Sequence, residues 1–416
     1  MKFSKFVFLF EEQSYFICFN SIFGKIVKLG KGNFDRNEIV PERLTEEQLN
    51  YLMSYHFIVE NDEEDQRIVE KSYRDRTNTK TLYITIEITT GCNFDCAFCY
   101  QHDWDFRSKI DMSDINKLIA IIQTSNLTNY NEVNIDFIGG EPFLYKESVL
   151  NIYRKFKSLC KKNNLKLSVK LNTNGSFLDS KTLSEFENTV IMFPFLAPSD
   201  YDSIVKLRTN KNNISLYQLL SDRISDWIST LNQNKTILLT FRYNVNHLNV
   251  DYIPTFFETI SSFGIMNYEV DFVNTANIGG NFNNNLSDTE FMAIYFDKIV
   301  PLCKKYGVKT PLKPRCEISR CKARHAGSLK LFANGKVGLC NGIFLERSMP
   351  HISSISQLEE IDEIYSEIKN YNYFKDELKC LNCRYVFLCG GPSPCANHKC
   401  PYDINNIRKY IYSIVQ

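Results

Sequence analysis

The sequence lacks several features that would assign it at once to a class. Its 416 residues include no apolar run near the roughly 20 that a membrane span needs, and the net charge is only +1. Duplex-binding proteins usually carry a basic excess, so we expect no nucleic-acid partner. Residues 1–10 lack a small-residue cleavage site and run into two glutamates, so they do not predict a signal peptide. We therefore expect a cytoplasmic protein with no membrane partner.

Several common catalytic patterns are also missing. The six histidines show no ligand spacing, and the chain has no phosphate-binding loop, Ser-His-Asp arrangement or paired carboxylates. No internal repeat of fixed period is present. Cysteine, by contrast, is abundant: the chain has 14, although disulfides are rare in the cytoplasm. Metal or cluster ligation is the leading use for so many thiols.

The cysteines fall into three sets. Cys18 lies in an alternating apolar stretch, and Cys160 and Cys303 continue helical apolar stripes, so we expect these three in the core. The second set is Cys92, Cys96 and Cys99. The third set lies near the C-terminal end and consists of Cys316, Cys321, Cys340, Cys380, Cys383, Cys389, Cys395 and Cys400. The last two sets carry the functional argument.

Periodicity divides the chain into three regions. Residues 1–78 contain short strand-like segments and a helix that begins at Thr45 in a capping box with Gln48. Residues 79–309 alternate apolar strands with amphipathic helices, which predicts a parallel sheet with right-handed crossovers in an open or barrel-like α/β fold. Residues 310–416 have few long periodic segments, so we expect bonds to metal to replace a hydrophobic core there.

The middle region gives the clearest secondary-structure prediction. Strands are expected in LYITIEIT, EVNIDFI, LKLSVKLN, TVIMFPF, TILLTFRYNV and NYEVDFV. Helices are expected over residues 111–124, 146–162, 180–187, 214–231, 252–263 and 287–306. The last of these begins at Ser287, in a capping box with Glu290, and ends at Gly307.

The second cysteine set has the spacing CxxxCxxC and directly follows the first strand of the middle region. In barrel-like α/β folds the loops after the strands' carboxyl ends carry the chemistry. Three thiolates on one loop can hold three irons of a [4Fe–4S] cluster and leave the fourth iron open to a ligand. A zinc site with one ligand missing, or three packed cysteines, remains an alternative.

The next strand runs into Gly139, Gly140, Glu141 and Pro142. Two glycines let a ligand approach the backbone closely, and a carboxylate can pair with an ammonium group. Alone, these four residues would indicate an ordinary turn. Their place at the strand end that follows the cysteine loop favours a binding role.

With both motifs intact and in order, residues 82–306 resemble the radical S-adenosylmethionine (SAM) enzymes. The resemblance implies a partial (β/α)6 barrel, similar to an incomplete TIM barrel, with SAM chelating the open iron. It implies cluster ligation by Cys92, Cys96 and Cys99, an adenine contact for Phe98, and a methionine-amine site at Gly139, Gly140 and Glu141. Reductive cleavage of SAM would give a 5′-deoxyadenosyl radical that abstracts a substrate hydrogen, with flavodoxin or ferredoxin as electron donor.

Other strand ends match the family less specifically. Thr173, Asn174 and Gly175 follow the third strand, and Arg242 and Asn244 end the fifth; similar residues in the family contact the SAM ribose and carboxylate. A plain turn and a surface charge are the alternatives. The fourth strand end, FLAPSDYDS, departs from the family pattern, so no role is carried over from it. One charged loop offers four candidate substrate contacts: His102, Asp103, Trp104 and Arg107. A solvated loop is the simpler interpretation of this segment.

The third cysteine set resembles the SPASM extension of peptide- and protein-modifying radical SAM enzymes. The resemblance implies two auxiliary [4Fe–4S] clusters, one on Cys316, Cys321, Cys340 and Cys395, the other on Cys380, Cys383, Cys389 and Cys400. The spacings before and after Cys395 depart slightly from the usual pattern. By count alone, two zinc sites would fit equally well. Three clusters predict about 12 irons per chain.

Two features favour a maturase of ribosomally made peptides among SPASM-type enzymes. Asn341 stands where sulfatase-maturing enzymes have an aspartate base, and residues 1–78 have the size and pattern of a leader-binding unit. We therefore expect a precursor peptide as partner and a thioether or other crosslink as product. The alternatives are a formylglycine-generating enzyme, a non-catalytic electron-transfer scaffold and, for residues 1–78, a packing extension of the barrel.

Overall fold

The computed structural model describes residues 1–35, 38–77, 80–99, 101, 108–201, 203–208, 215–275, 282–308, 322–340, 349–369, 382–389 and 404–415. The chain divides into two compact units. The first comprises Met1–Thr79, Leu312–Cys321 and Asn370–Gln416, and the second comprises Lys80–Pro311 and Lys322–Lys369. The C-terminal region predicted over residues 310–416 therefore contributes to both units, and the three predicted domain boundaries remain predictions.

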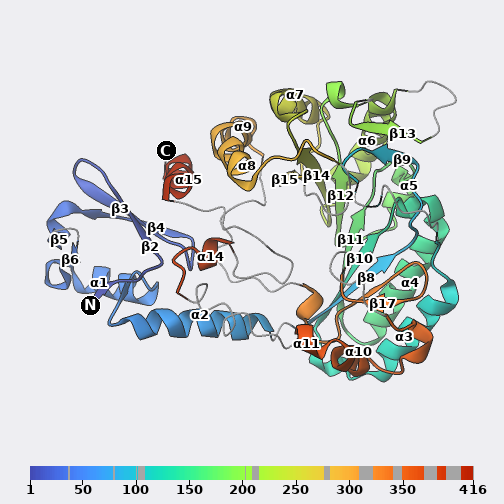
Figure 1. Cartoon of the computed structure of the whole chain (residues 1–416), viewed down its shortest axis with the longest axis horizontal. Coiled ribbons are helices and arrows are strands. Elements are labelled where there is room, and N and C mark those ends of the chain that lie inside the picture. The colour runs from blue at the N-terminus through green and yellow to red at the C-terminus, as the bar shows by residue number, and fades with distance from the viewer. Residues whose placement is uncertain are drawn as a thin grey trace. The chain divides into compact units, whose positions relative to one another are not determined.

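The second unit is built on a sheet with strand order β15-β14-β12-β11-β10-β8-β16-β17 (Figure 1). The six predicted strands are present as β8 (Thr81–Glu87), β10 (Glu132–Ile138), β11 (Lys166–Asn172), β12 (Thr189–Pro194), β14 (Ile237–Val245) and β15 (Tyr268–Asn274). All pairings among these six are parallel. This arrangement confirms the α/β fold class with a partial barrel.

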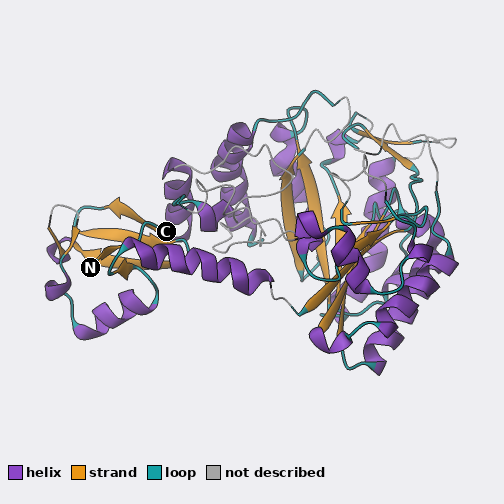
Figure 2. Ribbon diagram, turned by 60° about the horizontal axis from the view of Figure 1, so that its bottom comes forward, coloured by secondary structure: helices purple, strands orange, loops and turns teal. Residues whose placement is uncertain are grey.

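Helices connect the strands of this sheet in the predicted order. Figure 2 shows helices (purple) packed beside the strands (orange) of the sheet. They are α3 (Met112–Thr124), α4 (Lys146–Lys162), α5 (Ser180–Leu183), α6 (Leu216–Gln233) and α7 (Ile253–Ser262). The helix predicted over 287–306 is continuous but contains a π-helical turn, Tyr295–Ile299, between α8 (Asp288–Ile294) and α9 (Val300–Tyr306). The capping box at Ser287 and the left-handed end at Gly307 are both confirmed.

Alternation along each strand gives the sheet two different faces. In β10, Val133, Ile135 and Phe137 are wholly buried, whereas Asn134 and Asp136 point to the opposite face and are only half-buried. The helix α4 packs on β10 and β11, so the apolar face is the outer one. The other face, which we call the inner face, is consequently lined by polar side chains.

Residues 322–369 add an edge that the sequence did not predict. β16 (Leu329–Leu331) pairs parallel with β8 and antiparallel with β17 (Val337–Gly338), and α10 (Leu358–Ile364) and α11 (Ser366–Lys369) follow. Lys330 of β16 is fully buried, with its Nζ 3.1 Å from Glu87 Oε1. Neither charge would be stable there without the other. A three-residue strand is too short for its alternation to be recognised in the sequence.

The first unit contains an antiparallel sheet of β2 (Val7–Glu11), β3 (Tyr15–Asn20) and β4 (Lys25–Gly30). It also has the strand pairs β1 (Lys2–Phe3) with β7 (Ile58–Val59) and β5 (Phe34–Asp35) with β6 (Glu38–Ile39), and the helices α1 (Glu46–Ser54), α2 (Asp62–Thr77), α14 (Val386–Cys389) and α15 (Ile404–Val415). Phe8, Phe10 and Phe19 pack against Ile407 and Ile411 of α15. The two ends of the chain thus share one core.

Two smaller predictions are settled by burial and capping. Cys18, Cys160 and Cys303 are buried, which confirms their packing role, and burial raises the pKa of these thiols to about 12, 11 and 12 respectively. The Thr45–Gln48 capping box at the start of α1 is confirmed. Among the described residues, no helix has the length and apolarity to cross a membrane.

Candidate functional site

The cysteine loop follows β8 and carries a strand of its own. β9 (Phe94–Cys96) pairs antiparallel with β13 (Val205–Leu207), which places Val205 opposite Cys96. Two backbone bonds extend this pairing, from Ala97 N to Ile204 O and from Arg208 N to Asn93 O, each 2.9 Å long. The segment after the fourth parallel strand, to which sequence reasoning gave no role, therefore fixes the cysteine loop. Pairing between segments so far apart in the chain leaves no local sequence pattern.

The three thiols of this loop are in an environment that disfavours their ionisation. Burial raises the pKa of Cys92 to about 11 and also raises the pKa of Cys96 and Cys99. The neighbouring thiols raise the pKa of Cys96 further, and the Arg208 guanidinium, which donates to Phe94 O at 2.9 Å, lowers it. Iron binds thiolates and not thiols. These cysteines would therefore lose their protons only when the positive charge of a bound cluster stabilises the thiolates.

The three cysteines have the number and chemistry to hold three irons of a [4Fe–4S] cluster. Across the described ranges, no three Cys, His, Asp or Glu side chains converge closely enough to hold one ion. A [4Fe–4S] cluster takes one thiolate per iron, so its ligands stand further apart than those of a single ion. Three thiols on one short, pinned loop fit that requirement, with Cys92, Cys96 and Cys99 as the residues that would hold the cluster.

The strand end at Gly139 and Gly140 touches the start of the cysteine loop directly. Gly140 N donates to Thr89 O at 2.8 Å, and Glu141 N donates to Gly91 O at 2.9 Å. A Cβ at Gly140 would lie 2.2 Å from Gly91 O, and one at Gly139 would lie 2.3 Å from Thr89 O. Both positions therefore exclude a side chain because two backbones meet there. Their predicted contact with SAM remains a prediction.

Glu141 is fully buried at the centre of the motif. Its carboxylate accepts hydrogen bonds from Phe143 N (2.9 Å), Thr173 Oγ1 (2.7 Å) and Asn174 N (2.6 Å). Burial raises the pKa of Glu141 to about 7, although these three bonds lower it. A carboxylate has about four acceptor positions, so one is left over for the amine that we expect it to bind.

Thr173 and Asn174 join the two motifs. Besides the backbone bond to Glu141, the Asn174 amide donates to Asn93 Oδ1 at 2.9 Å and lies 3.8 Å from Cys92 Sγ. We call Cys92, Asn93, Glu141, Thr173 and Asn174 the rim network. Its bonds show that the Thr-Asn-Gly sequence is more than a plain turn, since it holds the carboxylate and the cysteine loop together. The predicted contacts of these residues with SAM stay predictions.

Gly175 closes this turn in a left-handed conformation, with φ at 77°. A Cβ there would lie 2.5 Å from the ring of Phe193 and 2.9 Å from that of Trp227. Because glycine has no Cβ, the turn can pack directly against Phe193 and Trp227.

The remaining predicted SAM contacts lie elsewhere at the same end of the sheet. Arg242 is half-buried, and its Nη2 and Nε donate to Asp271 Oδ2 at 2.6 and 2.9 Å. Asn244 follows on the same inner face of β14. Phe98 is half-buried and packs edge-on against Phe282. Among the described residues, no hydrogen bond links these three to the rim network.

Several predicted site residues lie outside the described residues: His102, Asp103, Trp104, Arg107, Cys316, Cys321, Asn341, Cys380, Cys395 and Cys400. Only the backbone of Cys389 is described, at the end of α14. Cys340 follows β17 and is half-buried, and Cys383 accepts a hydrogen bond from Tyr385 N at 3.4 Å. Cys340 is a free thiol. The two auxiliary clusters remain predictions.

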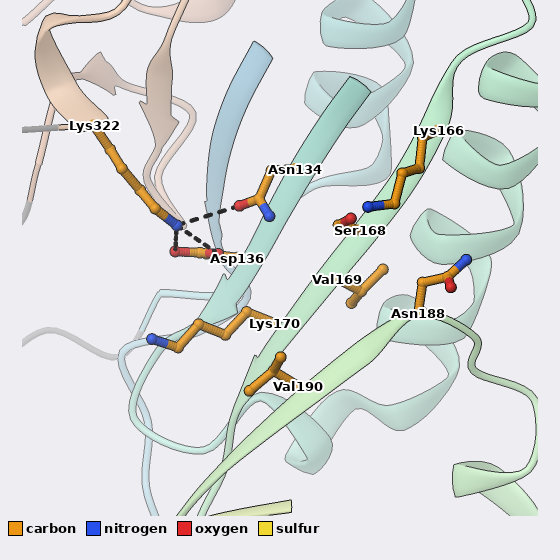
Figure 3. Close-up of a pocket in the computed structure, with 9 residues that line it drawn as sticks. All are labelled: Asn134, Asp136, Lys166, Ser168, Val169, Lys170, Asn188, Val190 and Lys322. Atoms are coloured by element: carbon orange, nitrogen blue, oxygen red, sulfur yellow. Dashed lines mark hydrogen bonds and ion pairs between the residues drawn. The ribbon is translucent and has the colours of Figure 1, made fainter. Parts of the chain in front are cut away.

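The inner face also carries a cavity of about 540 Å³ (Figure 3). Side chains of β10 and β11 line it together with Lys322, whose Nζ lies 3.2 Å from both Asn134 Oδ1 and Asp136 Oδ2. Lys170 lines the same cavity. Sequence reasoning singled out neither lysine, because each appears as one charge in an ordinary strand or loop.

Comparison with known proteins gives these observations a family context. Residues 86–231 match the model of the radical SAM superfamily. The radical SAM cyclopropyl synthase TigE of Paramaledivibacter caminithermalis is 23% identical over 370 residues, which cover 80% of this chain and 72% of that protein. An S-adenosylmethionine-dependent nucleotide dehydratase of Fibrobacter sp. is 22% identical over 183 residues, 42% of this chain and 52% of that protein.

Solved structures share the fold. A structure of anSMEcpe with bound AdoMet superposes with a TM-score of 0.59 at 16% identity, covering 80% of this chain and 97% of that one. Streptococcus suis SuiB bound to its precursor peptide SuiA gives 0.55 at 12% identity, covering 96% and 98%. At these identities the likeness establishes the partial-barrel architecture alone.

Proposed function

We propose that this chain is a radical SAM enzyme whose substrate is a ribosomally made precursor peptide. Residues 86–231 match the radical SAM superfamily model. The observation that carries the radical chemistry is the rim network, in which Asn174 connects Cys92 to the buried carboxylate of Glu141. The peptide assignment is supported by the fold shared with SuiB, a protein crystallised with its precursor peptide.

Residues of the rim network and of the neighbouring strand ends each bind a different part of the cluster or of SAM. Cys92, Cys96 and Cys99 hold the cluster, the free acceptor position of Glu141 takes the methionine amine, and Phe98 lies along the adenine. Gly139 and Gly140 bring their strand close enough for these groups to meet. Arg242, oriented by Asp271, and Asn244 present donors to the rest of SAM from β14. When bound, the cluster and SAM supply a 5′-deoxyadenosyl radical that removes a hydrogen atom from the substrate.

The C-terminal cysteines form, in this proposal, a SPASM domain over residues 310–416 with two closed [4Fe–4S] clusters. Closed clusters suit the removal of an electron from a substrate radical, which crosslinking requires. Flavodoxin or ferredoxin in the cytoplasm would supply the electron that starts each turnover. Anaerobic reconstitution should then give about 12 irons per chain, and about four irons with two zincs would contradict the auxiliary clusters.

Residues 1–78 are the proposed leader-binding unit. β2 and β4 are the edges of the three-stranded sheet, and an extended peptide can add to such an edge through backbone hydrogen bonds. β4 keeps Lys25 and Lys28 exposed, so an acidic leader segment suits this edge. The experiment is leader titration against the full chain: Lys25→Glu with Lys28→Glu should weaken binding, and unchanged affinity would contradict this surface.

The test of the function is anaerobic co-expression with the small peptide genes that neighbour this one, read by mass spectrometry. Each crosslink should remove two hydrogen atoms from a peptide, and a Cys92→Ala enzyme should leave the mass unchanged. Formylglycine in place of a crosslink would identify a sulfatase-maturing type of reaction. No mass change in any neighbouring peptide would contradict the proposal.

A further inference from the structure

In the middle of the inner face, two of the described lysines lie beside a single aspartate. The parallel pairing of β10 and β11 places Asp136 directly opposite Lys170. Asp136, however, is already engaged by Lys322, whose Nζ lies 3.2 Å from one carboxylate oxygen and 3.5 Å from the other. We call Asp136, Lys170 and Lys322 the inner-face site. It contains two ammonium groups for one carboxylate.

Lys170 is the lysine of this site that forms no ion pair with any described residue. Among the described residues, no carboxylate oxygen lies within 4.0 Å of its Nζ. Figure 3 shows its side chain beside Asp136, with no dashed line to any residue drawn. Other cations of the inner face are paired: Lys166 with Glu132 at 3.5 Å, Arg242 with Asp271 at 2.6 Å and Lys330 with Glu87 at 3.1 Å. The unpaired charge at Lys170 is thus a local exception.

The surroundings of Lys170 disfavour an ammonium group without a partner. Burial lowers the pKa of Lys170, and the charges of Arg242 and Lys322 lower it further, against the opposing effect of Asp136 and Asp271. A carboxylate that entered the site would restore charge balance and form a charge-assisted hydrogen bond. Removing water from an ammonium without such a partner is unfavourable.

The site has room for a ligand and lies close to the rim network. Lys170 lines the cavity of about 540 Å³, which is within the range of small-molecule pockets. It precedes Thr173 by three residues on the same strand path, which corresponds to about 10 Å at the usual rise per residue. Thr173 in turn bonds Glu141. A group held at Lys170 is therefore separated by about 10 Å of strand from Thr173. The partner of Thr173, Glu141, is the expected site of the SAM amine.

We propose that Lys170 binds a carboxylate of the peptide substrate and thereby orients the peptide beneath the SAM end of the sheet. The carboxylate belongs either to an Asp or Glu side chain or to the C-terminus, since both offer the same chemistry. That the carboxylate belongs to a peptide rests on the proposed function. The cationic site itself rests only on the contacts of the inner face.

The test measures how fast Lys170 is acetylated in the reconstituted full-length enzyme, with SAM present, by an amine-reactive reagent and mass spectrometry. Three probes are compared: Ac-Gly-Glu-Gly-NH2, its Gln counterpart, and Ac-Gly-Gly-Gly-OH. A bound carboxylate should slow the labelling of Lys170 by a factor of 1 + [L]/Kd, about fivefold at four times the Kd. Lys157 of α4, which is paired with Glu187 at 3.0 Å and does not line the cavity, serves as the control in the same spectrum and should not respond.

Each outcome decides the proposal. Protection by the Glu probe indicates a side-chain carboxylate, protection by the free C-terminus indicates the terminal one, and either result supports the site. Equal protection by the Gln probe, or no protection by any probe, overturns it. Protection by SAM alone, before any probe is added, assigns Lys170 to SAM and also overturns it.

A variant separates the inference from the function on which it rests. Lys170→Met should abolish calorimetric binding of the protecting probe, and Lys157→Met, outside the cavity, should leave it intact. Neither labelling nor calorimetry needs turnover. Protection of Lys170 together with a failure to mature any peptide would contradict the proposed function but support the carboxylate site. Maturation of a peptide without any carboxylate protection would do the reverse.

Discussion

The rim network and the inner-face site lie on the same sheet but differ in how fully their polar groups are satisfied. At the rim, Glu141 accepts three hydrogen bonds, and the two backbones at Gly140 leave no room for a side chain. On the inner face, Lys170 has a cavity beside it and no carboxylate partner among the described residues. At the rim, hydrogen bonds hold the Glu141 carboxylate in place and leave one acceptor position for the proposed SAM amine. In our proposal, the Lys170 ammonium gains its partner only when the peptide binds.

Removal of a cluster ligand from the cysteine loop should reduce activity and iron content most strongly. Cys96→Ala should abolish SAM cleavage and lower the iron content by about four atoms per chain. Cys160→Ala is the matched control, because this buried thiol packs between helix and sheet far from the loop in sequence and should keep all of the iron. Iron analysis and 5′-deoxyadenosine formation are the measurements. Full iron content in Cys96→Ala would remove this residue from the ligand set.

Two lysines of the inner face provide the next contrast. Lys330→Met leaves Glu87 buried without a counter-charge and should lower the free energy of unfolding by about 3–5 kcal/mol. Lys170→Met removes a charge that has no carboxylate partner among the described residues, and should leave stability unchanged or raise it. Urea unfolding of the apoenzyme measures both. Equal destabilisation by the two variants would show that Lys170 is a structural residue.

A smaller effect is expected where the two backbones meet. The Cβ of Gly140→Ala would lie 2.2 Å from Gly91 O, so the cysteine loop must shift, at a cost of about 1–3 kcal/mol in unfolding free energy. Gly32→Ala meets nothing within 4 Å and serves as the control. Urea unfolding together with iron content checks both. Unchanged stability and iron in Gly140→Ala would show that the contact is looser than described.

The smallest effect concerns the pH dependence of Glu141. Its pKa is about 7 in the folded chain against an ordinary 4.5, so its contribution to stability is complete below pH 4.5 and is lost as the pH rises through 7. Thr173→Val removes a bond that favours the charged form. Its loss of stability should therefore be greater at pH 8, about 1.5–3 kcal/mol, than at pH 5, about 1 kcal/mol. Thr173→Ser keeps the hydroxyl and should behave as the wild type; equal losses at both pH values in Thr173→Val would contradict the raised pKa.

The same comparison explains what the sequence could predict. Strands such as EVNIDFI alternate over enough residues to be recognised locally, and the cysteine and Gly-Gly-Glu motifs follow them at fixed positions. The pairing of β13 with β9, the added strand β16 and the Lys322–Asp136 contact join distant parts of the chain. Arg242 was recognised, but its partner Asp271 was not. Pairings of this kind depend on the folded sheet and leave no pattern in either segment alone.

As proposed above, the rim network directs SAM-derived radical chemistry at a carbon atom of a peptide. The most direct measurement is the deuterium content of the 5′-deoxyadenosine formed when the reconstituted enzyme turns over a precursor peptide deuterated on its carbon atoms. We predict that deuterium enters 5′-deoxyadenosine and that Cys92→Ala forms none of this product. Formation of 5′-deoxyadenosine without deuterium, at a rate that the peptide does not change, would contradict the claim.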